Sequence, residues 1–281
     1  MTSNAKKSLF WDAKFPVLKL TGDGCRKFLH GQTTSDILGV KDECLIRTCW
    51  LTSSGRLRSI LEINLRDKEA QIVVLAGKIK DLLIGFDRVI FPSDQVSIES
   101  TEEIRRVQKM SFETSWKESH TEWLPEDKSL PKLFNGFSSA NDKDIHEWRL
   151  RQGMLIGPNE IDAETIPYEI GLSDLISLDK GCYLGQEAMA RLKRIGRLKR
   201  QLRFWISVRN NDIETLLEIK GNNSINNSAS IISNLYLGNE TNIGLAMVRN
   251  KLLSNEEVFI SEEHKFCRIY LPIGFNEFSS N

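Results

Sequence analysis

The sequence contains no long hydrophobic segment and no excess of either charge. No run in its 281 residues approaches the roughly 18 apolar residues of a transmembrane helix. Residues 1–7 are polar and lack the apolar core of a secretory signal. Lys+Arg and Asp+Glu both number 38, so the formal net charge of zero gives no general attraction to nucleic acid or membrane. We therefore expect a cytoplasmic protein without membrane segments.

Cysteine and histidine are also scarce. The five cysteines are an odd number and form no C-x-x-C pair, so thiols in a reducing cytoplasm fit better than disulfides or a zinc site. Cys44 and Cys49 lie in a strand-like stretch and are expected in the core. The four histidines have no spacing typical of metal ligands, and the sequence predicts no metal site.

The composition is that of an ordinary globular protein, with 40% hydrophobic and 27% charged residues. A chain of this length is long for one core, so two or three domains are expected.

Periodicity and turn residues predict the local elements. A strand at 15–20 precedes a helix at 25–29, with Asp23 as a candidate cap. A split β-α-β module follows, with strands at 47–51, 57–65 and 71–75, a helix at 77–89 and a further strand from 96. Residues 111–145 are polar and are expected to cross the surface. Short strands at 202–208, 231–232, 243–248, 257–260 and 268–271, with an Asn/Ser-rich turn at 221–230, predict a small β-barrel.

The stretch Lys180-Gly181-Cys182-Tyr183-Leu184-Gly185-Gln186-Glu187 carries the chemistry. It reads as a loop that ends in a short helix, with Cys182 just ahead of or inside the first turn. The unpaired N–H groups of that turn and nearby Lys180 would favour a thiolate. The alternative is a buried cysteine that acts as a small hydrophobic residue.

A basic segment follows this stretch. Seven of the thirteen residues 191–203 are basic and none is acidic. Three interpretations remain open: a solvated surface, a site for the carboxylates of a ligand, or a set of phosphate contacts to RNA.

Lys-Gly-Cys-Tyr-x-Gly-Gln-Glu resembles the signature of YgfZ-type proteins, which are related to the T-protein (aminomethyltransferase) of the glycine cleavage system. Other segments resemble the same superfamily: Leu18 to Asp36, Arg149 to Gly153, Pro167-Tyr168-Glu169, Gly196 to Arg200 and Gly244 to Arg249. The resemblance implies an α+β fold with three domains in a ring, a ferredoxin-like middle module and a C-terminal β-barrel. The implied domains are residues 1–46 with 138–200, residues 47–137, and residues 201–281.

The resemblance also implies a function. YgfZ-type proteins are folate-binding accessory factors that support iron–sulfur cluster assembly or repair, including in tRNA-modifying enzymes. The implied cofactor is tetrahydrofolate, and the implied partners are iron–sulfur proteins or cluster-assembly factors, with tRNA involved only indirectly. Cys182 would be the reactive group, and Asp36 matches an aspartate that assists catalysis in T-proteins. The implied folate contacts are Glu169, Tyr183, Gln186, Glu187, Arg191, Arg197 and Arg200, the last two for the glutamate tail.

Two departures from the T-protein pattern argue against a working aminomethyltransferase and against pterin binding. Gly55 is followed by Arg56-Leu57-Arg58-Ser59, where T-proteins tend to have a pair of aspartates. Arg151 stands where T-proteins usually have a glutamate for the pterin, and a cation cannot accept hydrogen bonds from pterin N–H groups. The alternatives are a tetrahydrofolate-dependent aminomethyltransferase and an RNA-binding protein. For Asp36, the alternative role is to cap the backbone from Ile37 onward.

Overall fold

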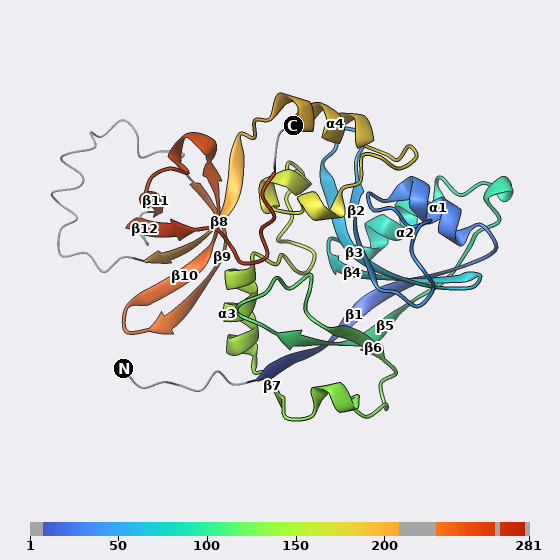
Figure 1. Cartoon of the computed structure of the whole chain (residues 1–281), viewed down its shortest axis with the longest axis horizontal. Coiled ribbons are helices and arrows are strands. Elements are labelled where there is room, and N and C mark those ends of the chain that lie inside the picture. Colours follow the sequence, from blue (N-terminus) through green and yellow to red (C-terminus); the bar gives the residue numbers. More distant parts are fainter. Residues whose placement is uncertain (1–7, 208–228, 262–264, 279–281) are drawn as a thin grey trace.

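The computed structural model describes residues 8–207, 229–261 and 265–278. Two antiparallel-rich sheets lie at opposite ends of the long axis, and helices lie on and between them (Figure 1). None of the helices in these ranges is both long enough and apolar enough to cross a membrane.

The larger sheet has seven strands in the order β2-β3-β4-β1-β5-β6, with β7 paired to β1. Its strands are β1 (Leu9–Thr21), β2 (Ile46–Leu51), β3 (Leu57–Arg66), β4 (Glu69–Ala76), β5 (Ser97–Met110), β6 (Thr121–Leu124) and β7 (Ser138–Ser139). All neighbours are antiparallel except β7. The strands expected near residues 47–51, 57–65 and 71–75 are confirmed as β2, β3 and β4. β1 lies between β4 and β5, so the sheet joins residues on both sides of the expected domain boundary at residue 46. The division into domains stays a prediction.

Helices α1 (Cys25–Gln32) and α2 (Ile79–Asp87) cover one face of this sheet. Side chains from both helices and from alternate strand positions form a buried cluster that includes Leu18, Leu29, Trp50 and Phe86. The expected cap of α1 is wrong. Gly24 is the N-cap residue and makes no side-chain cap, while Asp23 forms an ion pair with Lys68.

The polar segment 111–145 was expected to cross the surface, and this expectation is only partly right. The segment contributes β6 to the large sheet and buries Trp116, which is 1% exposed. Gln108 donates a hydrogen bond to the carbonyl of Trp116, which fixes the segment against β5. The segment is polar overall, but burial of the large Trp116 side chain is strongly favourable and draws the segment into the core.

The second sheet is a half-barrel of five antiparallel strands in the order β11-β12-β8-β10-β9. Its strands are β8 (Arg200–Ser207), β9 (Ala229–Gly238), β10 (Thr241–Arg249), β11 (Glu257–Ser261) and β12 (Lys265–Tyr270). Each of the five expected segments overlaps one of these strands. Most of the expected turn at 221–230 lies outside the described residues.

Helices α3 (Asp142–Gln152) and α4 (Gln186–Ile195) lie between the two sheets in the chain. α3 ends at Gly153, whose φ of 67° is the left-handed conformation typical of a glycine C-cap. One large hydrophobic core joins both sheets and contains Trp11, Trp148 and Leu202. The described ranges also contain five short 3-10 helices: Pro92–Asp94, Lys132–Phe134, Pro167–Ile170, Ser173–Leu175 and Asn250–Leu252.

Two cysteine expectations have different outcomes. Cys49 lies in β2 and is fully buried, as expected. Cys44 is exposed, because it precedes β2 and lies outside the sheet.

A buried ionic cluster crosses the large sheet. The carboxylate of Glu62 is fully buried and accepts hydrogen bonds from Arg106 at 2.7 and 2.9 Å. It also accepts one from Nε of Arg47 at 2.9 Å and one from the indole of Trp123 at 3.3 Å. A buried carboxylate stays charged only when paired and hydrogen-bonded in this way. The cluster ties β2, β3, β5 and β6 together.

Candidate functional site

The signature stretch forms an exposed loop that leads into α4. Cys182 is exposed, and α4 begins four residues later at Gln186. Gly185 is the N-cap residue and has a φ of 88°, which is readily reached only by glycine. Of the two expected positions, Cys182 therefore lies ahead of the first turn and not inside it, with three residues between it and Gln186. The α4 dipole acts within its first turn and gives no basis for thiolate stabilisation at Cys182.

Lys180 fixes this loop to the end of α1. Its ammonium donates hydrogen bonds to the carbonyls of His30, Thr33 and Ser35, at 2.7 Å for Thr33 and 2.8 Å for Ser35. Its Nζ atom also lies 4.9 Å from the centre of the Tyr183 ring, a cation–π contact. Burial lowers the Lys180 pKa to about 8, against an opposing effect of Asp36. The lysine thus holds two segments far apart in sequence.

Two predicted folate contacts in the signature point into the protein instead. Tyr183 is only 7% exposed, and burial raises the pKa of its hydroxyl. The side chain of Gln186 donates to the carbonyls of Leu178 at 3.2 Å and Lys180 at 3.3 Å. Both residues therefore support the conformation of the loop that presents Cys182. Glu187 and Arg191 are exposed on α4.

Asp36 lies beside the same end of α1. Its Oδ1 atom accepts backbone hydrogen bonds from Leu38 at 3.1 Å and Gly39 at 3.3 Å, and lies 3.3 Å from Nδ1 of His30. The backbone-capping role is therefore present. Burial and the charge of Lys180 lower the His30 pKa, whereas Asp36 raises it. Asp36, His30 and Lys180 thus form one group of interacting charges next to the signature loop.

Glu169 and Arg200, each predicted as a folate contact, form a second group by pairing with each other. Glu169 is 3% exposed, and its Oε2 lies 3.2 Å from Nε of Arg200. Burial raises the Glu169 pKa, and the charge of Arg200 opposes this shift. The Arg200 guanidinium also lies 3.4 Å from Asp162. Arg200 is thus already neutralised by two carboxylates, whereas Arg197 is exposed on the surface.

The turn between β2 and β3 packs on both α4 and the segment that precedes Glu169, a contact that no local pattern indicated. Gly55 at the turn packs so closely on α4 that a Cβ there would lie 2.6 Å from Met189 Cε. On its other side, Arg56 forms a 3.1 Å ion pair with Glu164, and the Leu57 N–H donates to the carbonyl of Thr165. The signature helix and the Glu169 segment are therefore held by one hairpin.

Arg151, which replaces the expected glutamate, has partners of its own. It forms a 2.8 Å ion pair with Glu147 one turn earlier on α3 and stacks 5.3 Å above the Phe204 ring. The described residues contain no group of three or more His, Cys, Asp or Glu side chains that could hold a metal. His264 lies outside the described residues.

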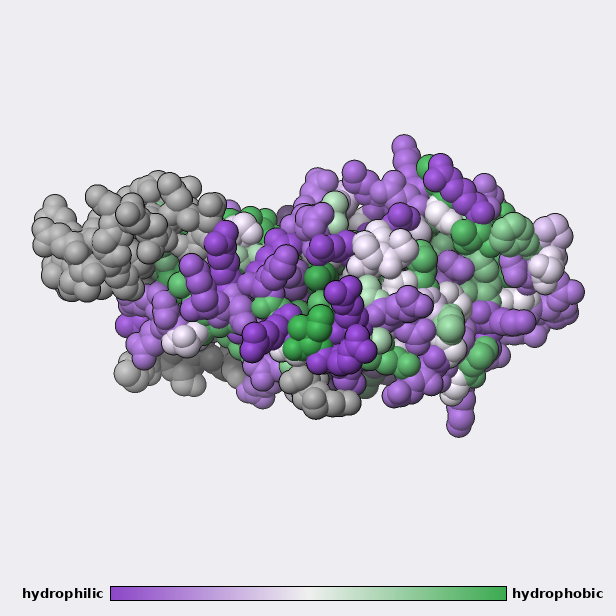
Figure 2. Space-filling model, turned by 90° about the horizontal axis from the view of Figure 1, so that it is seen from above, coloured by the Kyte–Doolittle hydropathy of each residue, from purple (hydrophilic) through white to green (hydrophobic). Residues whose placement is uncertain are grey.

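The surface around α4 is mainly hydrophilic. Figure 2, which views the molecule from above, shows hydrophilic side chains over most of this face with only small hydrophobic patches. α4 itself contributes the exposed cations Arg191 and Arg194.

Known proteins resemble this chain over very different lengths, from nearly the whole chain to about a fifth of it. The tRNA-modifying protein YgfZ of Vibrio atlanticus (strain LGP32) is 24% identical over 293 residues, covering 92% of this chain and 90% of that protein. The mitochondrial iron-sulfur cluster assembly factor IBA57 homolog of Eremothecium gossypii is 39% identical over 62 residues, or 21% of this chain and 13% of that protein. No family model matches the chain.

A solved structure confirms the fold. The glycine cleavage system aminomethyltransferase T from Bartonella henselae has a TM-score of 0.69 to this chain, at 13% identity, covering 97% of this chain and 88% of that one. The chain has a YgfZ/T-protein-like fold, as its signature predicted. The mixed α and β architecture is confirmed. The expected C-terminal β-barrel is a half-barrel of five strands, and the three-domain ring stays a prediction.

Proposed function

We propose that this chain, with its YgfZ/T-protein-like fold, is a folate-binding accessory protein that supports iron–sulfur cluster assembly or repair, including in tRNA-modifying enzymes. The observation that carries the proposal is the presentation of Cys182. The signature loop is held on its protein side by contacts of Lys180, Tyr183 and Gln186, whereas Cys182 is exposed. A structural cysteine has no need of such an arrangement, whereas a thiol that reacts with a partner does.

The names of similar proteins also support a role linked to iron–sulfur clusters and tRNA modification. YgfZ proteins are named as tRNA-modifying, and the IBA57 homolog is named as an iron–sulfur cluster assembly factor. The partners proposed for this chain are therefore iron–sulfur proteins or their assembly factors.

The residues present can supply the hydrogen-bond acceptor that a folate pterin needs. A pterin needs an acceptor for its N–H groups, and Arg151 cannot provide one. The buried carboxylate of Glu169 can, because its contacts to Arg200 and to the Ile166 N–H both use Oε2 and leave Oε1 to a ligand. Arg191 and Arg197 are exposed cations suited to the carboxylates of a glutamate tail.

The folate proposal is tested by titrating the purified full chain with tetrahydrofolate while following tryptophan fluorescence. Saturable binding that Glu169→Gln weakens supports the proposal. Glu164→Gln is the matched control, because Glu164 is a nearby carboxylate whose side chain is 72% exposed. Absence of binding, or equal loss in both variants, would refute the assignment of Glu169.

The cluster-related proposal is tested in cells that lack the native gene. Cys182→Ala should fail to restore the activity of an iron–sulfur enzyme, and Cys44→Ala, which removes the other exposed thiol, should restore it. Full function of Cys182→Ala would overturn the central role of this thiol.

The alternative is a tetrahydrofolate-dependent aminomethyltransferase, for which the T-protein-like fold is the supporting observation. The stretch Arg56-Leu57-Arg58-Ser59 stands where T-proteins tend to have two aspartates, which argues against it. Formation of methylenetetrahydrofolate from an aminomethylated carrier protein would decide in favour of this alternative.

A further inference from the structure

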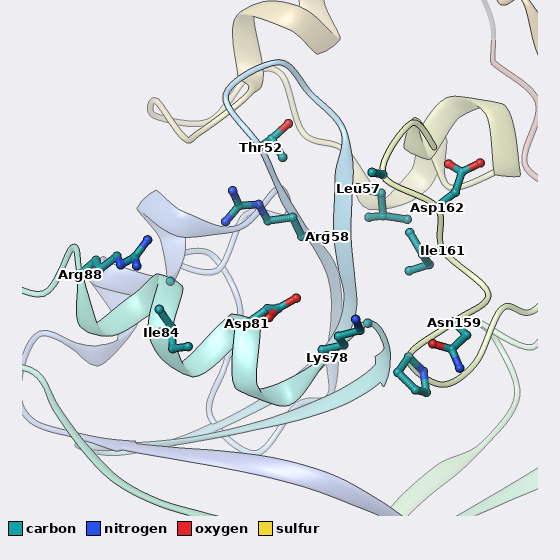
Figure 3. A pocket seen from close by; sticks show the side chains of 14 residues that line it. Thr52, Leu57, Arg58, Lys78, Asp81, Ile84, Arg88, Asn159, Ile161 and Asp162 are labelled. Atoms are coloured by element: carbon teal, nitrogen blue, oxygen red, sulfur yellow. The ribbon is translucent and has the colours of Figure 1, made fainter.

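A cavity of about 610 Å³ lies on the α2 side of the β2–β3 hairpin, and Cys182 is not part of its lining (Figure 3). Three segments line it: the hairpin, the start and exposed side of α2, and the loop at residues 158–163. Leu57, Ile84 and Ile161 provide apolar walls, so the cavity has both apolar and charged surfaces.

Three cations line this cavity: Arg58 from β3, Lys78 just before α2, and Arg88 at the end of α2. In Figure 3, Arg58 and Arg88 lie toward one end of the cavity and Lys78 lies toward the other. All three side chains are exposed, and none has an ion pair within 4 Å in the described part of the chain.

Local structure keeps Arg58 in place. Its guanidinium lies 4.8 Å from the ring centre of Trp50, a buried residue against which α2 also packs. Gly85 of α2 sits so close to this indole that a Cβ there would lie 2.4 Å from it. Arg58 is thus stacked on a rigid platform, and less conformational entropy is lost when it binds an anion.

The lining holds three cations and two carboxylates, Asp81 and Asp162, so positive charge exceeds negative charge. Asp162 is also shared with Arg200. The N-terminal end of α2 adds partial positive charge at Lys78, and Asp81 in the first turn offsets part of this charge. The positive excess is therefore largest at the end formed by Arg58 and Arg88.

We propose that this cavity binds a small ligand with two or more anionic groups, phosphates or carboxylates, separated by an apolar or planar part. Arg58 and Arg88 contact one anionic group, and Lys78 contacts the other. Leu57, Ile84 and Ile161 contact the part between them. The planar guanidinium of arginine can donate two parallel hydrogen bonds to either a phosphate or a carboxylate. The same residues would therefore recognise both kinds of anion. The site does not depend on the folate assignment of Glu169.

The test is calorimetric titration of the full chain with pyrophosphate, with ATP without divalent metal, and with tri-γ-glutamate. Saturable binding of at least one probe is expected, with an affinity that falls as salt rises. Arg58→Ala and Arg88→Ala should each weaken it by up to about fivefold, because one exposed charge contact contributes at most about that factor. Tighter binding of pyrophosphate and ATP would indicate a phosphate ligand, and tighter binding of tri-γ-glutamate a carboxylate ligand.

Lys80→Ala is the matched control, because Lys80 is an exposed cation on α2 that does not line the cavity. Arg194→Ala tests whether the basic surface of α4 binds the probes instead. Circular dichroism of each variant checks that it folds, and Arg58→Lys provides a milder substitution. Lack of saturable binding for all three probes overturns the proposal. Equal weakening by Lys80→Ala or Arg194→Ala also overturns it.

Discussion

Lys180 donates a hydrogen bond from its ammonium to the backbone carbonyl of Thr33, 2.7 Å away and 147 residues earlier in the chain. The same ammonium also binds the carbonyls of His30 and Ser35. The side chain of Lys180 thus links the Cys182 loop to the end of α1 through hydrogen bonds.

Lys180→Met should lower the free energy of unfolding by about 2 kcal/mol, because carbonyls that bound a charged donor lose it. It should also change the rate at which iodoacetamide alkylates Cys182, since the loop is released. Urea unfolding and mass spectrometry measure the two effects. Lys199→Met, which removes an exposed lysine, should change neither. An unaltered alkylation rate in Lys180→Met would show that the loop keeps its conformation without these hydrogen bonds.

The exposure of the thiols predicts their reactivity. Cys182 and Cys44 should be alkylated rapidly in the folded protein, and Cys25, Cys49 and Cys267 only after unfolding. Burial raises the pKa of Cys25 to about 11 and of Cys49 to about 12, which removes the reactive thiolate at neutral pH. Peptide mapping after brief treatment with maleimide checks this order. Equally fast modification of Cys49 would contradict the burial of β2.

The buried carboxylate of Glu62 should make stability depend on pH. Burial alone would raise its pKa, but Arg106 and Arg47 outweigh this effect and lower it from 4.5 to about 2. Between these values the unfolded chain binds more protons than the folded one. The stability from this charge is therefore complete above pH 4.5 and is lost as the pH falls toward 2. Urea unfolding from pH 7 to pH 3 measures the loss.

Glu62→Gln should lose about 3–5 kcal/mol at pH 7, because Arg106 remains buried without its charge partner. Its stability should then vary less with pH below 4.5 than that of the native chain. Glu126→Gln is the control, since the ion pair of Glu126 with Lys14 is exposed. A small and pH-independent loss in Glu62→Gln would contradict the proposed charge state of the cluster.

The hairpin turn should tolerate no side chain at Gly55. Its φ of 77° disfavours other residues, and a Cβ would lie 2.9 Å from Ala188 and 2.6 Å from Met189 Cε. Gly55→Ala should cost about 1–3 kcal/mol and displace α4. Gly31→Ala is the opposite case, because Gly31 is helical and has nothing within 4 Å of the added atom. It should gain about 0.5–1 kcal/mol from helix propensity. Thermal unfolding of both variants measures whether each one is less or more stable than the native chain.

Local sequence patterns predicted most of the elements of this protein. Alternation from Leu57 onward predicted β3, and apolar residues at helical spacing predicted α2. These features depend on neighbours within a few residues, where periodicity and backbone conformation are encoded directly. The signature at Lys180 to Glu187 likewise indicated the fold, because the whole stretch is contiguous.

The partners of charged side chains were decided only by the tertiary structure. Glu62 and Arg106 read as ordinary polar strand positions, yet they meet in the core, since β3 and β5 lie in one sheet. Lys180 was expected to influence Cys182 and instead binds the end of α1. Arg200 was expected to face a ligand and is paired with Glu169. A sequence shows which residues carry charge, but the energy of each charge depends on burial and distance, which only the packed chain sets.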